Sequence, residues 1–138
     1  MFKKMFKKKE DNKNEKSVLM TALLIHAAKI DDNYTDIEKK IIKSAIMDLY
    51  SLKESEVEKI LIKSEEKEQE SNQIVEFTRE IKNNSFKFRL NIIEILWKIV
   101  YSDGSSDDYE SNLIRRVCGL LYISDKDSGI IKNKVRNL

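Results

Sequence analysis

The sequence predicts an all-α fold: a compact domain of about seven helices, built from two helix–acidic loop–helix pseudo-repeats. Three observations predict it. The chain has no proline and only three glycines among 138 residues, so it contains few residues that interrupt helices. Its apolar residues recur at helical spacing, and no segment alternates as a half-buried strand does. Finally, the chain resembles itself at an offset of 72 residues.

The first three helices follow from apolar runs and start signals. The first is predicted over 17–29, which contains the apolar run VLMTALLIHAA. The second begins at Thr35, because Thr35-Asp-Ile-Glu38 has the form of a capping box. A third begins near 53–55 and ends in the charged run KSEEKEQES, which is predicted to be a solvated helix face.

The remaining helices complete the domain. A shorter helix is predicted over 72–83, and the segment 85–102 is apolar on most sides, which indicates a buried central helix. The next helix starts near Asp107, and the last covers 125–136. Cys118, the single cysteine, lies in the apolar run LIRRVCGLL and is predicted to be a core residue. One cysteine also excludes an internal disulfide and a Cys-rich zinc site.

The internal repeat places the acidic segments in equivalent positions. At the offset of 72 residues, Leu24, Asp31, Asp36, Glu38, Ile42 and Tyr50 meet the identical residues Leu96, Asp103, Asp108, Glu110, Ile114 and Tyr122. Each copy is an apolar helix, an acidic loop and an amphipathic helix that ends in a short turn. Packing one copy against the other would shield the apolar faces of both.

The acidic segments have two interpretations, and helix capping is the first. An acid or hydroxyl before a helix accepts hydrogen bonds from free backbone N–H groups, and a Glu three residues later closes the box. Asp107 with Glu110 repeats the arrangement of Thr35 with Glu38. Acids in the first turn also interact favourably with the helix dipole. This interpretation does not account for Asp103, which precedes the helix.

The second interpretation is a site for a divalent cation, calcium or magnesium. Alternate residues of a tight loop can direct oxygen ligands at a hard cation. The positions with this spacing are Asp103, Ser105 and Asp107 in one segment and Asp31, Asn33 and Thr35 in the other, followed by Glu110 and Glu38. The pattern departs from a standard calcium loop, because Gly104 stands second and the Glu eighth. The residues alone leave both interpretations open.

The sequence patterns give little support to an enzyme: paired carboxylates could serve acid–base work, as in a hydrolase, but nothing suggests a substrate cleft. His26 is the only histidine, and its place on an apolar helix predicts a structural role. The chain has no HExxH pattern, phosphate-binding glycine loop or nucleophile elbow. The formal charge of +2 is close to balance, so the domain as a whole is not a basic nucleic-acid-binding domain. We therefore expect a protein that is not an enzyme and has no nucleic-acid partner.

The first sixteen residues differ from the rest. They carry seven lysines and three acids, and we expect residues 1–16 to form a basic, flexible tail on a domain that spans 17–138. Phe2, Met5 and Phe6 fall at helical spacing among the lysines, which would permit weak contact with an anionic membrane. The absence of a secretory signal predicts a cytoplasmic location, peripheral to the inner membrane if the tail binds.

Three segments together resemble the tellurite-resistance protein B-like (TerB-like) family. SDGSSDDYESNLIRRVCGLLYIS resembles the family signature, in which ADG, a Glu, an apolar helix and an LGLS-type turn recur twice. AAKIDDNYTDIEKKIIKSAIMDLYSLKESE is similar to the first copy, with Asp32 where the family often has Gly. IVEFTREIKNNSFKFRLNIIEILWKIVYSDG is similar to the linking helices. The resemblance covers roughly residues 18–130.

The resemblance implies a compact helical domain associated with tellurite resistance and stress responses, with no assigned reaction. It also implies a metal site made of Asp31, Asp36 and Glu38 with Asp103, Asp107 and Glu110. The function we expect is a non-enzymatic stress-associated module that binds a divalent cation through its acidic loops. The alternative is an adaptor for a protein partner or a membrane surface, in which the acidic loops only cap helices.

Overall fold

The computed structural model describes residues 2–30, 34–71, 73–103 and 108–138, and side chains for 15–30, 34–71, 73–102 and 111–138. Within these ranges it contains seven α-helices, two 3-10 helices and no strand. The helices are α1 Phe2–Ala28, α2 Asp36–Tyr50, α3 Glu54–Glu70, α4 Ile74–Thr78, η1 Ile81–Asn83, α5 Phe86–Val100, η2 Tyr101–Asp103, α6 Asp108–Leu120 and α7 Asp125–Arg136. The all-α prediction is confirmed.

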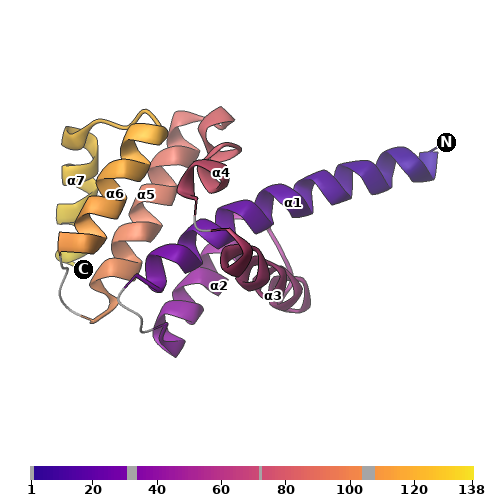
Figure 1. Ribbon diagram of the computed structural model, residues 1–138, viewed down its shortest axis with the longest axis horizontal. Coiled ribbons are helices and arrows are strands. Elements are labelled where there is room, and N and C mark those ends of the chain that lie inside the picture. The colour runs from indigo at the N-terminus through magenta and orange to yellow at the C-terminus, as the bar shows by residue number, and fades with distance from the viewer. Residues whose placement is uncertain (1, 31–33, 72, 104–107) are drawn as a thin grey trace.

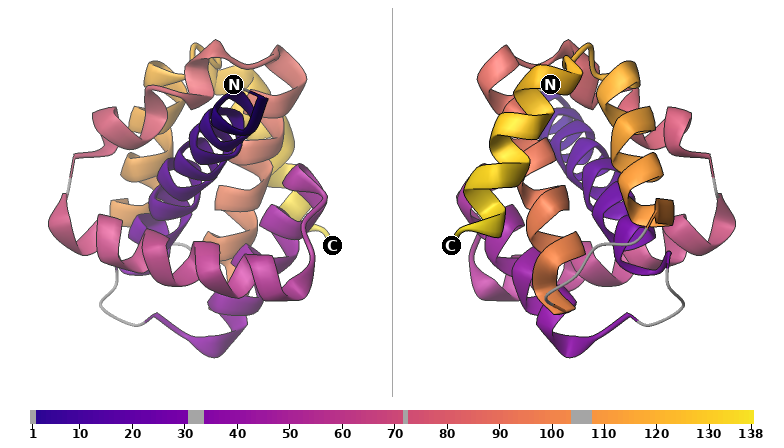
Figure 2. Two further views of the ribbon diagram at one scale, coloured as in Figure 1. Left: turned by 90° about the vertical axis from the view of Figure 1, so that its right-hand side faces the viewer. Right: turned by 90° about the vertical axis from the view of Figure 1, so that its left-hand side faces the viewer.

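Helix α1 connects the parts of the fold. It packs against α2, α3, α4 and α5, while α5, α6 and α7 lie side by side (Figures 1 and 2). The C-terminal ends of α1 and α5 lie toward the same end of the molecule (Figure 1).

The start of α1 corrects the predicted helix boundary. The sequence predicted a helix from 17 and a flexible tail before it, whereas α1 begins at Phe2 and extends beyond the other helices (Figure 1). Residues 2–16 contain neither proline nor glycine and are rich in lysine, so nothing in them stops a helix from continuing. The boundary between a tail, 1–16, and a domain, 17–138, stays a prediction.

The other predicted boundaries agree with the structure except at 72–83. That segment is divided into α4 and η1. The Asn84 side-chain amide donates to the carbonyls of Glu80, at 2.9 Å, and Ile81, at 3.2 Å. Such side-chain bonds to the backbone compete with a regular helix, and here they accompany the tighter 3-10 turn.

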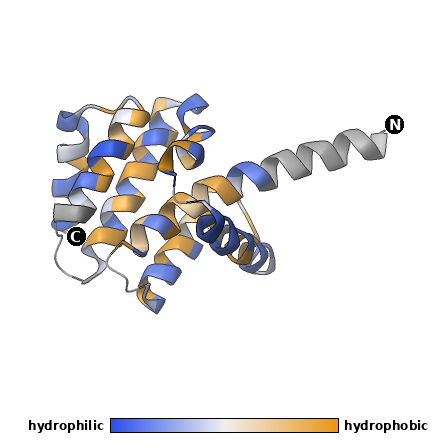
Figure 3. Ribbon diagram, in the orientation of Figure 1, coloured by the Kyte–Doolittle hydropathy of each residue, from blue (hydrophilic) through white to orange (hydrophobic). Residues whose placement is uncertain are grey.

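The core is centred on α5, as its apolar sequence predicted. Its buried residues are Ile92, Ile93, Ile95, Leu96, Trp97, Ile99 and Val100, and the helix is largely hydrophobic whereas α3 is largely hydrophilic (Figure 3). Trp97 is a core residue, and its indole N–H donates to the Ser128 hydroxyl of α7 at 3.2 Å. Phe86, the first residue of this segment's helix, is 47% exposed, so the burial predicted for the segment does not extend to its start. Cys118 is buried, as predicted.

Helices α2 and α6 end in the same way. Ser51, one position beyond α2, and Tyr122, two positions beyond α6, have positive φ values of 51° and 57°, a correspondence shifted by one residue from the offset of 72. After each, a backbone N–H reaches back into the last turn: Leu52 donates to Met47 at 3.2 Å, and Ile123 donates to Cys118 at 2.9 Å. This bond belongs to the Schellman type of helix end. The duplication of the whole domain stays a prediction.

In the described part of the chain, none of the helices has the length and apolar character needed to cross a membrane.

Candidate functional site

The structure places only part of the predicted cation site. Asp36 and Glu38 lie in the first turn of α2 and are described completely. Asp103 ends η2 and Glu110 lies in the first turn of α6, but their side chains lie outside the described set. Asp31, Ser105 and Asp107 lie outside the described residues. Whether these groups meet around a cation therefore stays a prediction.

The predicted capping box at the start of α2 is confirmed. The Thr35 hydroxyl accepts a hydrogen bond from the Glu38 backbone N–H at 3.1 Å. In return, Glu38 Oε1 accepts bonds from the Thr35 backbone N–H and hydroxyl, both at 2.9 Å. Glu38 is only 6% exposed, so these bonds satisfy a carboxylate oxygen that has little contact with water. Helix capping is thus one established role of Glu38.

A second acid, Glu68 of α3, is buried although the sequence predicted a solvated helix face. Its Oε2 accepts a hydrogen bond from Lys29 Nζ at 2.8 Å, and its Oε1 lies 3.2 Å from His26 Nδ1. The Glu68 side chain is only 7% exposed. A buried carboxylate is tolerated because it has charged and polar partners, and this one joins α3 to α1.

The sequence contained a signal for this burial. Val57, Ile60, Leu61, Ser64 and Glu68 are the buried residues of α3, and their spacing of three and four places them on one face. The charged run KSEEKEQES hid the last two members of that face. His26 has the structural role that was predicted, with Glu68 and the ring of Phe77, whose centroid is 6.3 Å away, as its neighbours.

Tyr34 lies between these two acids. Burial and the nearby carboxylates of Glu65, Glu38 and Glu68 raise its pKa above the ordinary value. Its hydroxyl is buried and has no hydrogen-bond partner among the described residues. Lys39 stands over the ring, with Nζ 4.9 Å from the centroid. Tyr34 therefore lies near acids of both α2 and α3, with the Lys39 ammonium over its ring.

These groups do not form a recognisable metal centre. No cluster of three or more His, Cys, Asp or Glu side chains suited to a metal occurs in the part of the chain whose side chains are described. His26 has one carboxylate and one lysine beside it, whereas a zinc site needs at least three protein ligands. Burial raises the pKa of the Cys118 thiol, which suits a core residue rather than a nucleophile.

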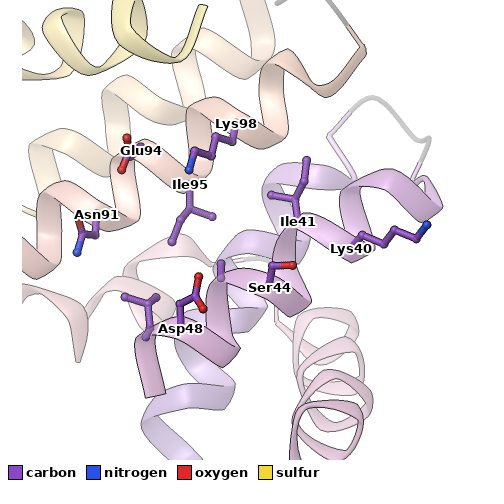
Figure 4. Close-up of a pocket in the computed structure, with 10 residues that line it drawn as sticks. Lys40, Ile41, Ser44, Asp48, Asn91, Glu94, Ile95 and Lys98 are labelled. Atoms are coloured by element: carbon purple, nitrogen blue, oxygen red, sulfur yellow. The ribbon is translucent and has the colours of Figure 1, made fainter. Parts of the chain in front are cut away.

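A groove between α2 and α5 has a size that suits a small ligand. Its volume is about 430 Å³ (Figure 4), within the range of about 300–1,000 Å³ that is typical of ligand pockets. The residues around it are Lys40, Ile41, Ser44, Ala45, Asp48, Leu49, Asn91, Glu94, Ile95 and Lys98. Aliphatic side chains form its floor, and polar side chains stand on its rim.

The rim of this groove carries charges of both signs. Lys98 and Asp48 stand on facing walls, whereas Lys40 points away from the other labelled side chains (Figure 4). The remaining acid, Glu94, is paired with Lys134 of α7 at 2.7 Å. Such a groove can orient a bound molecule by its charges. The sequence did not reveal this groove, because its two walls come from α2 and α5, whose packing against each other the sequence did not predict.

Comparison with known families matches residues 17–133 to the family described as tellurite resistance protein TerB. The match covers most of the chain and includes both acidic segments. No significant match is found among curated proteins or among solved structures.

Proposed function

The chain belongs to the tellurite resistance protein TerB family, and from this membership we propose that it is a non-enzymatic, stress-associated module. We further propose that it takes up a divalent cation, calcium or magnesium, through its acidic segments. The site would use Asp103, Ser105, Asp107 and Glu110, with a second, weaker set in Asp31, Asp36 and Glu38. Carboxylate and hydroxyl oxygens are the ligands that these hard cations prefer.

The position of Asp103 carries this proposal. It is the last residue of η2, and α6 begins only at Asp108. The residue that caps a helix stands immediately before its first turn, so Asp103 is too early to cap α6. Capping does explain acids such as Glu38, but it gives no reason for an acid at 103. A cation bound by the segment would give one.

Titration calorimetry on the full chain tests cation uptake. We expect heat on addition of calcium or magnesium, together with a rise in melting temperature, because a ligand that binds only the folded state stabilises it. At a free concentration of one hundred times Kd the gain is about 2.7 kcal/mol. Potassium chloride at matched ionic strength controls for screening. No heat and no thermal shift at millimolar metal would contradict the proposal.

A second candidate function is an adaptor at an anionic membrane surface, for which the start of α1 provides specific support. Helix α1 begins at Phe2. The seven lysines of residues 1–16 therefore belong to the same helix that enters the core at its other end. Each basic residue near an anionic leaflet contributes about 1 kcal/mol. The attraction would weaken with added salt.

Sedimentation with vesicles tests the adaptor. We expect the full chain to sediment with phosphatidylglycerol vesicles at low salt and to remain in solution with phosphatidylcholine vesicles. Removal of residues 1–16 should abolish the sedimentation. The adaptor proposal is contradicted if the truncated chain sediments as well as the full chain, or if the full chain does not sediment. In either case residues 1–16 would not be a membrane-binding segment.

A further inference from the structure

We propose that the surface where α6 ends against α4 and η1 docks an acidic peptide segment of a partner protein, one that inserts an apolar side chain. We call this the Tyr122 surface. It consists of Val75, Thr78, Arg79, Lys82, Gly119, Leu120 and Tyr122, around a hollow of about 150 Å³. It lies where α5 begins, away from the acidic segment that follows α5 (Figure 1), so the proposal is independent of cation uptake.

The first observation is the backbone of Tyr122. Its φ of 57° is in the left-handed region, which glycine enters freely and bulky residues rarely adopt. Packing does not compensate, because Tyr122 is 74% exposed. At the equivalent helix end, Ser51 meets the same backbone requirement with a small side chain. The large ring at 122 therefore has no folding role that explains it, and an unfavourable backbone that persists is often found at functional sites.

The second observation is that apolar groups flank the hollow. Val75, at the start of α4, is 52% exposed and lines the hollow together with Tyr122. Gly119 lies between them on α6, and a side chain added there would meet nothing within 4 Å. The surface thus has two exposed apolar walls and an accessible stretch of helix backbone. An apolar side chain that entered the hollow would bury part of both walls.

The third observation is the charge around these walls. Arg79 and Lys82 are exposed, and neither forms an ion pair within the described part of the chain. The nearby acid of α4, Glu76, forms its ion pair with Lys67 Nζ at 3.1 Å and accepts a bond from the Ser71 hydroxyl at 2.9 Å, and Arg79 acts on it only through the longer-range attraction of its charge. Two unpaired cations beside an apolar hollow complement a segment that carries acids next to an apolar side chain.

Size and charge identify the occupant as a peptide. The hollow of about 150 Å³ is well below the range of about 300–1,000 Å³ that is typical of small-molecule pockets. It suits a single inserted side chain. Two cations are also fewer than the clusters of about four to eight that mark binding to anionic lipid. An anchor side chain with a charged rim is the common form of a protein-recognition site.

A displayed library of random twelve-residue peptides, panned against the full chain, tests the proposal. We expect enrichment of peptides with Asp or Glu beside Leu, Ile, Met or Phe. The most enriched sequence, synthesised with a fluorescent label, is then measured by anisotropy. Tyr122→Gly should weaken its binding at least tenfold while the melting temperature stays equal or rises, because glycine suits the backbone at 122. Arg79→Glu should also weaken binding at least tenfold.

Two matched variants serve as controls. Ser51→Gly makes the same backbone change at the end of α2, and Lys63→Glu makes the same kind of charge reversal on the exposed face of α3. Each should leave the Kd within twofold of that of the unchanged chain. The proposal is overturned if the library yields no enriched acidic peptide, or if Tyr122→Gly binds the selected peptide normally. It is also overturned if Tyr122→Gly reduces sedimentation with phosphatidylglycerol vesicles but not peptide binding.

Discussion

The pair α1–α2 and the pair α5–α6 follow the same order of elements but hold their neighbours by different interactions. In both, a helix whose last part is apolar leads through an acidic segment to an amphipathic helix, and a residue with positive φ lies just beyond the end of that second helix. The first pair holds α3 through the buried carboxylate of Glu68. The second holds α7 through the indole of Trp97 and the Ser128 hydroxyl. A similar local sequence thus fixes similar helices, while the packed neighbour decides the side-chain chemistry.

The same contrast appears where the amphipathic helices end. Ser51 and Tyr122 satisfy one backbone requirement with very different side chains. Both helix ends need a residue with positive φ, but the two side chains at these positions differ in size. The choice of side chain therefore affects the surface rather than the fold. Each half therefore has to be tested separately for function, with the other half as its control.

Removing the paired core leucines should have the largest effect. Leu24 and Leu96 are identical in the offset alignment, and both are fully buried. We expect Leu24→Ala and Leu96→Ala each to lower the free energy of unfolding by about 2–5 kcal/mol, through lost burial and the cavity left behind. Urea denaturation measures this. Ile62→Ala, at an exposed position of α3, should change stability by no more than about 0.5 kcal/mol.

A loss confined to one of the two leucine variants would break the comparison, because it would show that the two halves do not share a core of equal importance.

Removing Glu68 should have a smaller effect that is specific to the first half. Glu68→Ala leaves His26 and Lys29 without their partner, and breaking a fully buried ion pair costs about 3–5 kcal/mol. Because the Lys29 side chain is 36% exposed, we expect a lower cost of about 1–3 kcal/mol. Chemical denaturation at neutral pH gives the value.

The exposed pair of Lys43 and Glu58, 2.5 Å apart, provides the control for Glu68. Glu58→Ala should cost no more than about 1 kcal/mol, as surface ion pairs usually do. Equal costs for the two substitutions would show that the contacts of Glu68 with His26 and Lys29 contribute no more to stability than an exposed ion pair does.

Helix capping should differ between the halves by a smaller amount. Thr35→Ala removes both hydroxyl-mediated bonds of the capping box of α2, whereas Ser85→Ala removes a single bond, from Phe88 N–H, at the start of α5. We expect each substitution to cost about 0.5–2 kcal/mol, with Thr35 the more costly. Thermal unfolding followed by circular dichroism orders the two. If Ser85→Ala cost more than Thr35→Ala, the additional bond of the capping box would not contribute to stability beyond a single N-cap bond.

The sequence predicted the helices better than their packing. The boundaries of α2 and α7 follow from signals that lie within a few residues of each helix start, such as Thr35 with Glu38. The burial of Glu68 depends on His26 and Lys29, which are 42 and 39 positions away. The groove between α2 and α5 likewise depends on contacts between distant segments. Periodicity shows which face of a helix is buried, but not which helix covers it.

The residues of the predicted cation site also differ in how far the local sequence determines their roles. Local sequence gave the capping role of Glu38, which the structure confirms. The convergence of Asp103 with Asp107 and Glu110 on one ion would need the path of the segment between η2 and α6, which spacing alone does not determine. The comparison between the halves is therefore sharpest at Asp103 and Asp31, the equivalent first acids.

The calcium-induced shift in melting temperature of Asp103→Asn, read beside that of Asp31→Asn, tests the central claim most directly. Asparagine keeps the size of the side chain but removes its charge, so metal-free stability should change by no more than about 0.5 kcal/mol. Because a hard cation is held mainly by carboxylate charge, Asp103→Asn should lose most of the shift, and Asp31→Asn should lose less. A full calcium-induced shift in Asp103→Asn would show that the cation does not sit in the second acidic segment.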